Sequence, residues 1–266
     1  MRWVLKALYK DPFHYIYDID AIALQYGFYN FYNTKEDSCV MFVEIGYLHA
    51  TVFVVQYDRE GMRILYCQPI EGCSGRDFDK VLTDLVYERL LSHPKMTITE
   101  TDFTPRDRMA ILSQCEKTKQ FLGVNGLPDH DIKISIKSRD VVVHFTTVEF
   151  NEKAEPLIQH LKKACKNCLL TMHKQYQEFE HEQAKPNTES TIVHSPEETP
   201  TPTGTPTATI PELLPITTII LEGSSARFQC VAMAMKQVVR EFTKEMESAG
   251  SADGMNPDKK IRIDIK

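Results

Sequence analysis

The sequence contains no apolar run approaching the roughly 20 residues needed to cross a bilayer, so no membrane-spanning helix is expected. It also lacks a basic stripe, because 31 Lys and Arg residues are outnumbered by 37 Asp and Glu residues and the formal net charge is -6. Binding to nucleic acid depends on clustered Lys and Arg, which this composition does not provide. The sequence therefore predicts neither a membrane nor a nucleic acid as a partner.

The seven cysteines form neither a disulfide framework nor a complete metal motif. Their number is odd, they are scattered and no secretory signal precedes them, so we expect reduced thiols and a cytoplasmic location. Cys165 and Cys168 form a C-x-x-C pair inside a Lys-rich helical stretch, with His160 and His173 nearby. No second Cys or His pair completes four zinc ligands, so we interpret the pair as two cysteines on a helix and predict no metal site.

The length and composition fit an ordinary globular protein with one large domain or two small ones. The chain has 266 residues, of which 42% are hydrophobic and 26% charged. Residues 184–215 differ, since Thr, Pro, Glu and Ser dominate them and large apolar side chains are scarce. Such a segment cannot offset its ordering entropy by burial, so we predict a disordered insertion. The same domain then comprises residues 1–183 and 216–249, followed by a divergent tail at 250–266.

The periodicity of apolar residues predicts a mixture of strands and helices. The strands are expected at 39–45, 50–57 and 62–70 as an antiparallel meander, at 132–136 and 141–145 as a hairpin, at 216–221, and at 260–265 as an edge strand. The helices are expected at 20–27, capped by Asp18 or Asp20 and ended by Gly27, at 78–90, at 105–122, at 147–183 with a break at Pro156, and at 226–249. Thr146 and Glu149 have the spacing of a capping box.

Two turns that contain glycine and follow apolar strands form the chemical centre of the sequence. Gly46 lies in the segment 43–49 (VEIGYLH), and Gly223 lies in 221–227 (LEGSSAR), which opens a predicted helix. The backbone N–H groups at such a turn suit phosphate or ribose hydroxyls. A glycine at a strand end is more often only a turn residue, so each turn alone is weak support for a binding site.

The order of several motifs adds to this interpretation. Residues 20–27 (DAIALQYG) are similar to a D-M-T-A-V-A-L-N-Y-G helix, and 72–79 (GCSGRDFD) to L-G-G-x-D-F-D. Residues 115–119 (CEKTK) resemble a C-E-K-x-K helix that lies along adenosine, and 221–227 resemble L-V-G-G-S-T-R. In this order the motifs resemble the nucleotide-binding domain of the heat-shock protein 70 superfamily, and above all its one-hundred-ten-kilodalton branch.

The resemblance covers roughly residues 15–230 and implies an α/β fold. The expected fold is an actin-like ATPase (ribonuclease H-like) lobe, with a mixed sheet and a helical and strand subdomain. It is expected to be incomplete, because the first lobe of the family lies upstream of anything in this sequence. The resemblance also implies that the two turns flank one nucleotide and therefore lie close together. The implied nucleotide-contacting residues are Gly46, Tyr47, His49, Glu116, Lys119, Gln120, Gly123, Gly223, Ser224, Ser225 and Arg227.

Departures from the family pattern predict that catalysis is lost. The family's phosphate loop reads D-L-G-G-G-T, whereas this chain has Glu44, then Gly46, then the bulky Tyr47 and Leu48. Side chains at these positions obstruct close approach of phosphate to the backbone, and the longer Glu44 displaces the carboxylate that would organise magnesium-bound water. We therefore expect weak binding of ATP or ADP, no magnesium and no catalytic residue.

These inferences lead to two main functional hypotheses. The first is a degenerate chaperone-type nucleotide-binding domain, a pseudo-ATPase that acts as a non-catalytic co-chaperone or nucleotide-exchange-like partner. Its partners would be a full-length seventy-kilodalton chaperone or unfolded clients, contacted through the helices after residue 76 and the strand face of Ile132, Ile134 and Ile136. The alternative is an ATP-dependent folding chaperone with a divergent site. A sugar-kinase-like or actin-like member of the same fold and an incomplete gene product are further alternatives.

Overall fold

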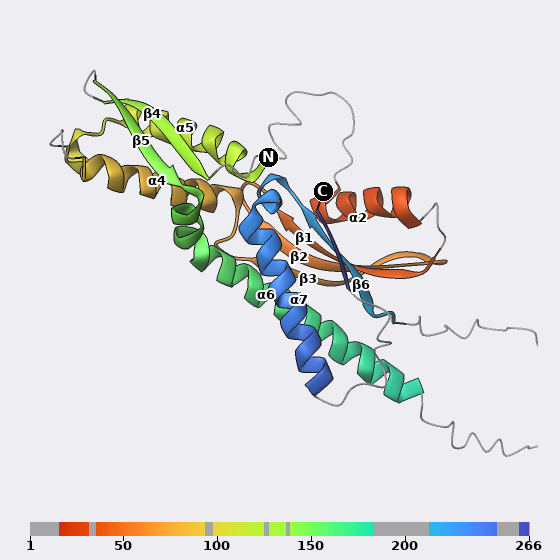
Figure 1. The fold of residues 1–266 in the computed structure, drawn as a ribbon. Coiled ribbons are helices and arrows are strands. Elements are labelled where there is room, and N and C mark those ends of the chain that lie inside the picture. Colours follow the sequence, from red (N-terminus) through yellow and green to blue (C-terminus); the bar gives the residue numbers. More distant parts are fainter. Residues whose placement is uncertain are drawn as a thin grey trace, which may run out of the picture.

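The structure is a computed structural model, which describes residues 16–31, 36–93, 98–124, 128–136, 139–183, 213–248 and 261–265. A five-stranded sheet, in the order β3-β2-β1-β6-β7, is joined by helices and a two-stranded sheet of β4 and β5 (Figure 1). The elements are α2 (Asp18–Tyr26), the π-helical η1 (Gly27–Phe31), β1 (Ser38–Ile45), β2 (Ala50–Asp58), β3 (Gly61–Ile70), α4 (Gly75–Leu91), the 3-10 helix η2 (Glu100–Asp102), α5 (Pro105–Val124), β4 (Asp129–Ile136), β5 (Arg139–Thr146), α6 (Thr147–Gln183), β6 (Ile216–Glu222), the 3-10 helix η3 (Ser224–Arg227), α7 (Gln229–Ser248) and β7 (Arg262–Ile265). The predicted α/β class with a mixed sheet is confirmed.

The larger sheet combines an antiparallel meander with two parallel strands. β1 pairs with β2 and β2 with β3 in antiparallel fashion, as the short connections predict. β6 lies parallel to β1, although about 170 residues separate the two strands in the chain, and β7 lies parallel to β6 at the sheet edge. The last part of the chain thus completes the sheet that its first part begins.

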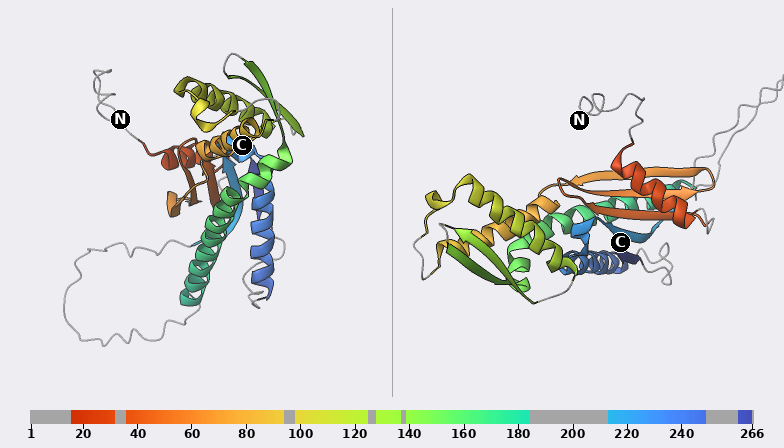
Figure 2. Two further views of the ribbon diagram at one scale, coloured as in Figure 1. Left: turned by 90° about the vertical axis from the view of Figure 1, so that its left-hand side faces the viewer. Right: turned by 90° about the horizontal axis from the view of Figure 1, so that it is seen from above.

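Both faces of the larger sheet are covered. On β1, Cys39, Met41 and Val43 point into the main core, which α4, α6 and α7 share. Val40 and Phe42 point to the opposite face, where α2 contributes Ala23 and Tyr26 to a smaller core. Figure 2 shows α2 on one side of the sheet and α6 and α7 on the other. Since β1 has buried side chains on both faces, it reads as a continuous apolar run in the sequence.

The β4–β5 hairpin and helices α4 and α5 form a second layered unit. Alternate residues of both strands are buried, so the prediction of one wet face is confirmed. The apolar face of Ile132, Ile134 and Ile136 is at most 4% exposed, because it packs into the core. The expectation that this face contacts a partner was wrong, because the face is buried inside the protein. The side chains of β4 that face outward include Lys133 and Ser135.

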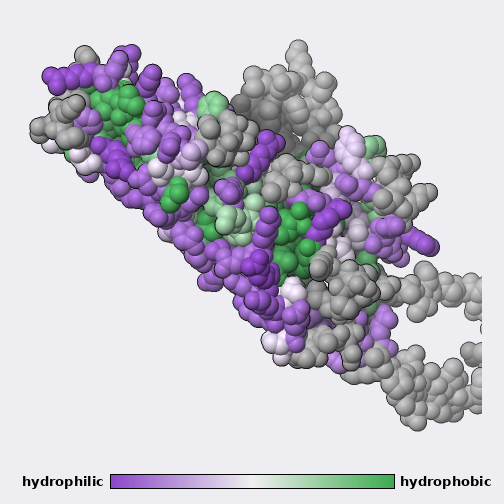
Figure 3. All heavy atoms as spheres, viewed as in Figure 1, coloured by the Kyte–Doolittle hydropathy of each residue, from purple (hydrophilic) through white to green (hydrophobic). Residues whose placement is uncertain are grey.

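α6 is one continuous helix of 37 residues, so the predicted break at Pro156 was wrong. Proline deprives the carbonyl four residues earlier, that of Glu152, of its helical partner. Both Glu152 and Pro156 lie on the exposed side of α6, where water can solvate the freed carbonyl. The face seen in Figure 3 is largely hydrophilic along the diagonal that α6 follows. The break is therefore avoided because the proline faces solvent.

The predicted stop of α2 at Gly27 is confirmed, because the α-helix ends at Tyr26 with Gly27 as its C-cap, and the π-helical η1 follows. The predicted start was wrong, since the N-cap is Tyr17 and neither Asp18 nor Asp20 caps the helix with its side chain. A Cβ at Gly27 would lie 2.8 Å from Cε1 of Tyr57, which shows why a glycine stands here. Its absence of a side chain lets α2 approach the sheet closely.

The remaining boundaries refine the predicted organisation. Leu213 and Leu214 pack against the main core, and the Leu214 N–H donates to Oε1 of Gln56 at 3.1 Å. Residues 213–215, the end of the predicted disordered insertion, are therefore ordered, and the prediction was wrong there. The rest of that prediction, over residues 184–212, lies outside the described residues. The helix predicted from Ala226 begins three residues later, after η3 and Phe228. The predicted edge strand is confirmed as β7.

Candidate functional site

The two glycine turns meet at the ends of neighbouring parallel strands. Glu44 of β1 is in register with Glu222 of β6, so each strand delivers its turn to the same edge of the sheet. Gly223 has a φ of +98°, and a Cβ added to it would lie 2.3 Å from the carbonyl oxygen of Ile45. The predicted closeness of the two turns is confirmed.

The first turn, residues 46–49, is tied to the start of α4. The N–H of Gly75 donates to the carbonyl of Gly46 at 2.8 Å, and the N–H of Arg76 donates to the carbonyl of Tyr47 at 2.9 Å. The Ser74 N–H donates to Oδ2 of Asp77 at 2.8 Å. These are the donors that a helix N-terminus would offer an anion, and here groups of the chain itself accept their hydrogen bonds.

Tyr47 connects the first turn to α5. Its hydroxyl donates to Oε1 of Glu116 at 3.1 Å, although the two residues are 69 positions apart. The Nζ atom of Lys119 lies 5.6 Å from the centroid of the Tyr47 ring, within the range of a cation–π contact. The hydrogen bond to Glu116 is the largest of the effects that raise the pKa of Tyr47. Three of the predicted site residues are thus in contact with one another.

Lys119, which lies against the Tyr47 ring, also forms an ion pair and a hydrogen bond with α4. Its ammonium lies 2.6 Å from Oδ1 of Asp79 and donates to the Gly75 carbonyl at 2.7 Å. Asp79 is fully buried, and its burial raises the pKa of its carboxyl while Lys119 lowers it. A buried carboxylate needs a positive partner, and Lys119 supplies it. The lysine that the resemblance assigns to the nucleotide therefore has an internal ion-pair partner.

The second turn presents a mixture of buried and exposed groups. Ser225 is 1% exposed, and its Oγ would lie 3.2 Å from a Cβ added at Gly75, so this turn packs directly against the start of α4. Ser224 and Arg227 are exposed. Because η3 follows Gly223, the turn does not open an α-helix, and the amides of the first α7 turn begin only after Phe228.

The other predicted site residues lie around this centre. His49 is exposed, and its Nε2 is 3.9 Å from carboxylate oxygens of both Asp18 and Glu44. Desolvation by burial raises the pKa of Glu44. Gln120 is exposed on α5, and Gly123 lies in the last turn of the same helix. The role of both residues stays a prediction.

Asp79 is a site residue whose role the sequence did not reveal. It is the last residue of the motif at 76–79 (RDFD), which marks the resemblance without indicating a partner for its carboxylate. The signal was a charged residue on the apolar stripe of a predicted helix, at the spacing of Leu82 and Val86. A charge at such a position is stable only if an opposite charge reaches it.

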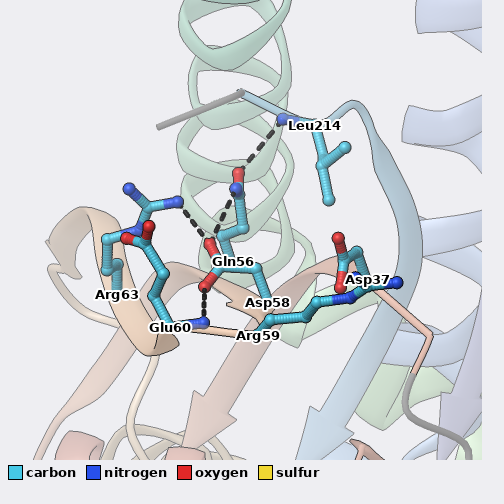
Figure 4. Close-up of a pocket in the computed structure, with 7 residues that line it drawn as sticks. All are labelled: Asp37, Gln56, Asp58, Arg59, Glu60, Arg63 and Leu214. Atoms are coloured by element: carbon cyan, nitrogen blue, oxygen red, sulfur yellow. Dashed lines mark hydrogen bonds and ion pairs between the residues drawn. The ribbon is translucent and has the colours of Figure 1, made fainter. Parts of the chain in front are cut away.

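Two hollows lie away from the turns. The first is polar and is lined by Asp37, Gln56, Asp58, Arg59, Glu60, Arg63 and Leu214 (Figure 4). At its centre Asp58 forms an ion pair with Arg63 and accepts the Glu60 N–H at 3.0 Å. Burial works to raise the pKa of Asp58, but hydrogen bonds from Glu60 and Gln56 together with Arg63 lower it. Gln56 also accepts the Leu214 N–H, so the β2–β3 hairpin is anchored to the start of the segment that leads into β6.

The second hollow is apolar and lies between the end of α2 and the β2–β3 hairpin. It is lined by Leu24, Gln25, Gly27, Phe28, Tyr29, Phe31, Tyr57, Gly61 and Met62. Phe28 is 65% and Tyr29 64% exposed. This surface is separate from the meeting point of the two turns.

The structure also shows where Cys165 and Cys168 lie. Cys165 and Cys168 lie on the buried face of α6, and burial raises the pKa of both thiols. Their interpretation as two cysteines on a helix is confirmed. Among the described residues, no group of three or more His, Cys, Asp or Glu side chains could hold a metal ion. Within the same residues no helix is long and apolar enough to span a membrane.

The first turn and the start of α4 do not fit the phosphate groups of a nucleotide in this arrangement, whereas Ser224 and Arg227 of the second turn are exposed. The first N–H groups of α4 are used by Gly46 and Tyr47, and the charge of Lys119 is paired with Asp79. The Tyr47 side chain also lies between the first turn and Glu116. Because the α4 donors and the charge of Lys119 are already paired within the chain, no catalytic step can be derived from this side of the site.

Comparison with known proteins identifies relatives of the chain. The family model described as Hsp70 protein matches residues 13–181. Heat shock 70 kDa protein 15 of Arabidopsis thaliana is 25% identical over 159 residues, which are 59% of this chain and 19% of that protein. Heat shock protein hsp88 of Neurospora crassa is 29% identical over 156 residues, covering 55% and 21% of the two chains. A heat shock protein homolog of Saccharomyces cerevisiae is 23% identical over 154 residues, covering 57% and 22%.

The chain spans about a fifth of the length of the curated relatives it matches. Domains of this family in general bind ATP or ADP with magnesium. The family match covers more than half of this chain, and it includes the first turn, α4, α5 and most of α6. The chain therefore belongs to the Hsp70 family, as a divergent and partial nucleotide-binding domain of the actin-like ATPase fold.

Proposed function

We propose that this chain is a non-catalytic chaperone module, which acts in the cytoplasm as a co-chaperone or nucleotide-exchange-like partner of a full-length seventy-kilodalton chaperone. The observation that carries this proposal is the pairing of the α4 amides of Gly75 and Arg76 with the carbonyls of the first turn. A pseudo-ATPase that keeps the family's framework while the donors beside its first turn are paired internally is suited to contact other proteins. Family membership supplies the chaperone context, and the role as a partner is an analogy at the level of the fold.

The stability of the framework supports a role that depends on surface and shape. The two turns, α4 and α5 are held together by hydrogen bonds and an ion pair between residues of the chain. Nothing in this arrangement calls for a bound nucleotide to complete it. A module of this kind can present one conformation to a partner continuously, whereas an ATPase must alternate between states.

Two measurements on the whole chain test the proposal. In the first, a fluorescent ATP analogue is titrated with and without magnesium, and we expect no saturable binding at micromolar concentrations. In the second, the immobilised chain is incubated with a purified full-length seventy-kilodalton chaperone, and we expect retention that a denatured sample of the chain does not reproduce. Magnesium-dependent micromolar binding would instead favour an ATP-dependent folding chaperone, and a chaperone that is not retained would refute the partner role.

A further inference from the structure

The space between the first turn and α5 is occupied by a side chain of the protein itself. Tyr47 leaves the turn and reaches Glu116 across 69 positions of sequence. Its backbone is held at the same time, because its carbonyl accepts the N–H of Arg76 at 2.9 Å. Both ends of this residue are therefore tied, one to α4 and the other to α5.

The surface under the Tyr47 ring is also fixed. Lys119 lies 5.6 Å from the ring centroid, and its ammonium is held by Asp79 at 2.6 Å and by the Gly75 carbonyl at 2.7 Å. Lys119 is 8% exposed, so its position is set by the interior. The ring thus rests on a cation that cannot move away without leaving Asp79 buried and unpaired.

The chemistry of these contacts resembles that of a bound nucleoside. Carboxylates bind ribose by accepting hydrogen bonds from its hydroxyls, and flat aromatic groups bind cations through their faces. Tyr47 offers a hydroxyl to Glu116 and an aromatic face to Lys119. One side chain thereby covers both groups on α5 that could otherwise recognise a nucleoside, and Lys119 is in addition paired with Asp79.

We propose that Tyr47 is an internal latch, which occupies the space between the first turn and α5 and excludes nucleoside phosphates from it. This inference rests on the proposed function, in which the chain binds no nucleotide, and it assigns the exclusion to one residue. The neighbouring Leu48 is 63% exposed and serves as the matched comparison, because it occupies the same turn.

The test measures binding of a fluorescent ADP by anisotropy to the full chain and to three variants. Tyr47→Gly removes the latch, Tyr47→Phe keeps the ring without its hydroxyl, and Leu48→Gly introduces the same backbone freedom while retaining Tyr47. We expect Tyr47→Gly to bind at least about tenfold more tightly than the unaltered chain and Tyr47→Phe to fall between them. Leu48 was also predicted to obstruct phosphate, so Leu48→Gly is expected to gain affinity, but clearly less than Tyr47→Gly. Tyr47→Gly binding no more tightly than Leu48→Gly would overturn the proposal.

A replacement variant and a titration of the Tyr47 phenol complete the test. If Tyr47→Gly does not fold, Tyr47→Ser removes the ring without adding glycine freedom and is judged by the same comparison. A spectroscopic titration of the phenol, taken as the difference from Tyr47→Phe, checks the latch without any nucleotide. Glu116→Gln should lower the pH at which Tyr47 ionises, and an unchanged titration would show that the hydrogen bond is not formed.

Failure of the latch and failure of the proposed function give different results. If Tyr47→Gly gains no affinity while the unaltered chain still retains the full-length chaperone, only the latch is refuted. If the unaltered chain does not retain the chaperone, the partner role is refuted whatever Tyr47→Gly binds.

Discussion

Gly223 lies directly against the carbonyl oxygen of Ile45, and a Cβ at this glycine would approach that oxygen to 2.3 Å. The contact joins the end of β6 to the end of β1 and brings the two turns together. Backbone lies on both sides of it, so neither partner can rotate away as a flexible side chain would. The meeting of the turns therefore depends on a residue without a side chain at position 223.

Gly223→Ala should be strongly destabilising, because it combines a φ of +98° with this clash. Gly61→Ala is the matched control, since its φ is +137° but an added Cβ would meet nothing within 4 Å. We expect Gly61→Ala to cost about 1–2 kcal/mol of unfolding free energy and Gly223→Ala at least about 2 kcal/mol more. Urea denaturation followed by circular dichroism measures both. Equal losses would show that β6 can shift away from Ile45.

Lys119→Met should leave Asp79 buried without a positive partner, at a cost of about 3–5 kcal/mol at neutral pH. Burial already raises the pKa of Asp79, and loss of Lys119 removes the influence that lowers it. A carboxyl with a raised folded-state pKa contributes stability in acid that is lost as the pH rises through that pKa. The deficit of Lys119→Met relative to the unaltered chain should therefore shrink between pH 7 and pH 5.

The control for this prediction is a double variant that carries Lys119→Met together with Asp79→Asn. It has no carboxyl at position 79, so its stability relative to the unaltered chain should lack the acid-dependent recovery. Denaturation midpoints at pH 7 and pH 5 provide the comparison. A Lys119→Met deficit that is the same at both values would indicate that water or another cation neutralises Asp79.

His173 predicts a different dependence on acid. Its Nε2 is buried and has no hydrogen-bond partner among the residues that the structure describes, and its ring makes an edge contact with Phe242 of α7 at a centroid distance of 5.8 Å. Desolvation by burial lowers the pKa of His173. The unfolded chain therefore binds the proton first, and stability is lost as the pH falls from about 6.5 through the folded-state pKa.

His173→Phe removes this titration and retains an aromatic ring beside Phe242. We expect its melting temperature to fall less than that of the unaltered chain when the pH is lowered from 7 to 5. Thermal denaturation in matched buffers measures the difference. Parallel curves for the two proteins would show that His173 is protonated as readily in the folded state as in the unfolded one.

The start of α6 provides a prediction about local stability. The Glu149 N–H donates to Oγ1 of Thr146 at 3.1 Å, and the Thr146 N–H donates to Oε2 of Glu149 at 2.8 Å. Thr146→Ala should cost about 1 kcal/mol by removing the hydroxyl cap. Val148→Ala, at a 64% exposed position in the same turn, should change stability by less than about 0.5 kcal/mol. Similar losses in both variants would mean that the cap contributes little.

Local patterns predicted much of this fold. The alternation of apolar and polar residues at 132–136 fixed which face of β4 is buried, because a strand exposes every second side chain to the same side. The capping box of Thr146 and Glu149 depends only on a spacing of three residues, and both of its hydrogen bonds are present. The closeness of Gly46 and Gly223 followed from the family resemblance, since no local pattern indicates which strands pair.

The errors arose where a tertiary contact outweighed a local preference. The face of Ile132, Ile134 and Ile136 looks like a surface for a partner, but it packs into the main core. Pro156 looks like a break, but its place on the exposed side of α6 makes the lost hydrogen bond tolerable. The contact between Tyr47 and Glu116 joins residues 69 positions apart, which no periodicity can reveal. Side chains that meet only after folding were therefore beyond prediction.

The parallel pairing of β1 with β6 has a consequence for synthesis of the protein. β1 is complete once Ile45 has been translated, but its neighbour begins only at Ile216. At a translation rate of about 5–20 residues per second, roughly 10–35 seconds pass before the ribosome makes that strand. During this interval the nascent chain has an apolar strand with one unpaired edge, which invites aggregation. The late arrival of β6 thus leaves this edge of β1 without its final neighbour until residue 216 and those after it have been made.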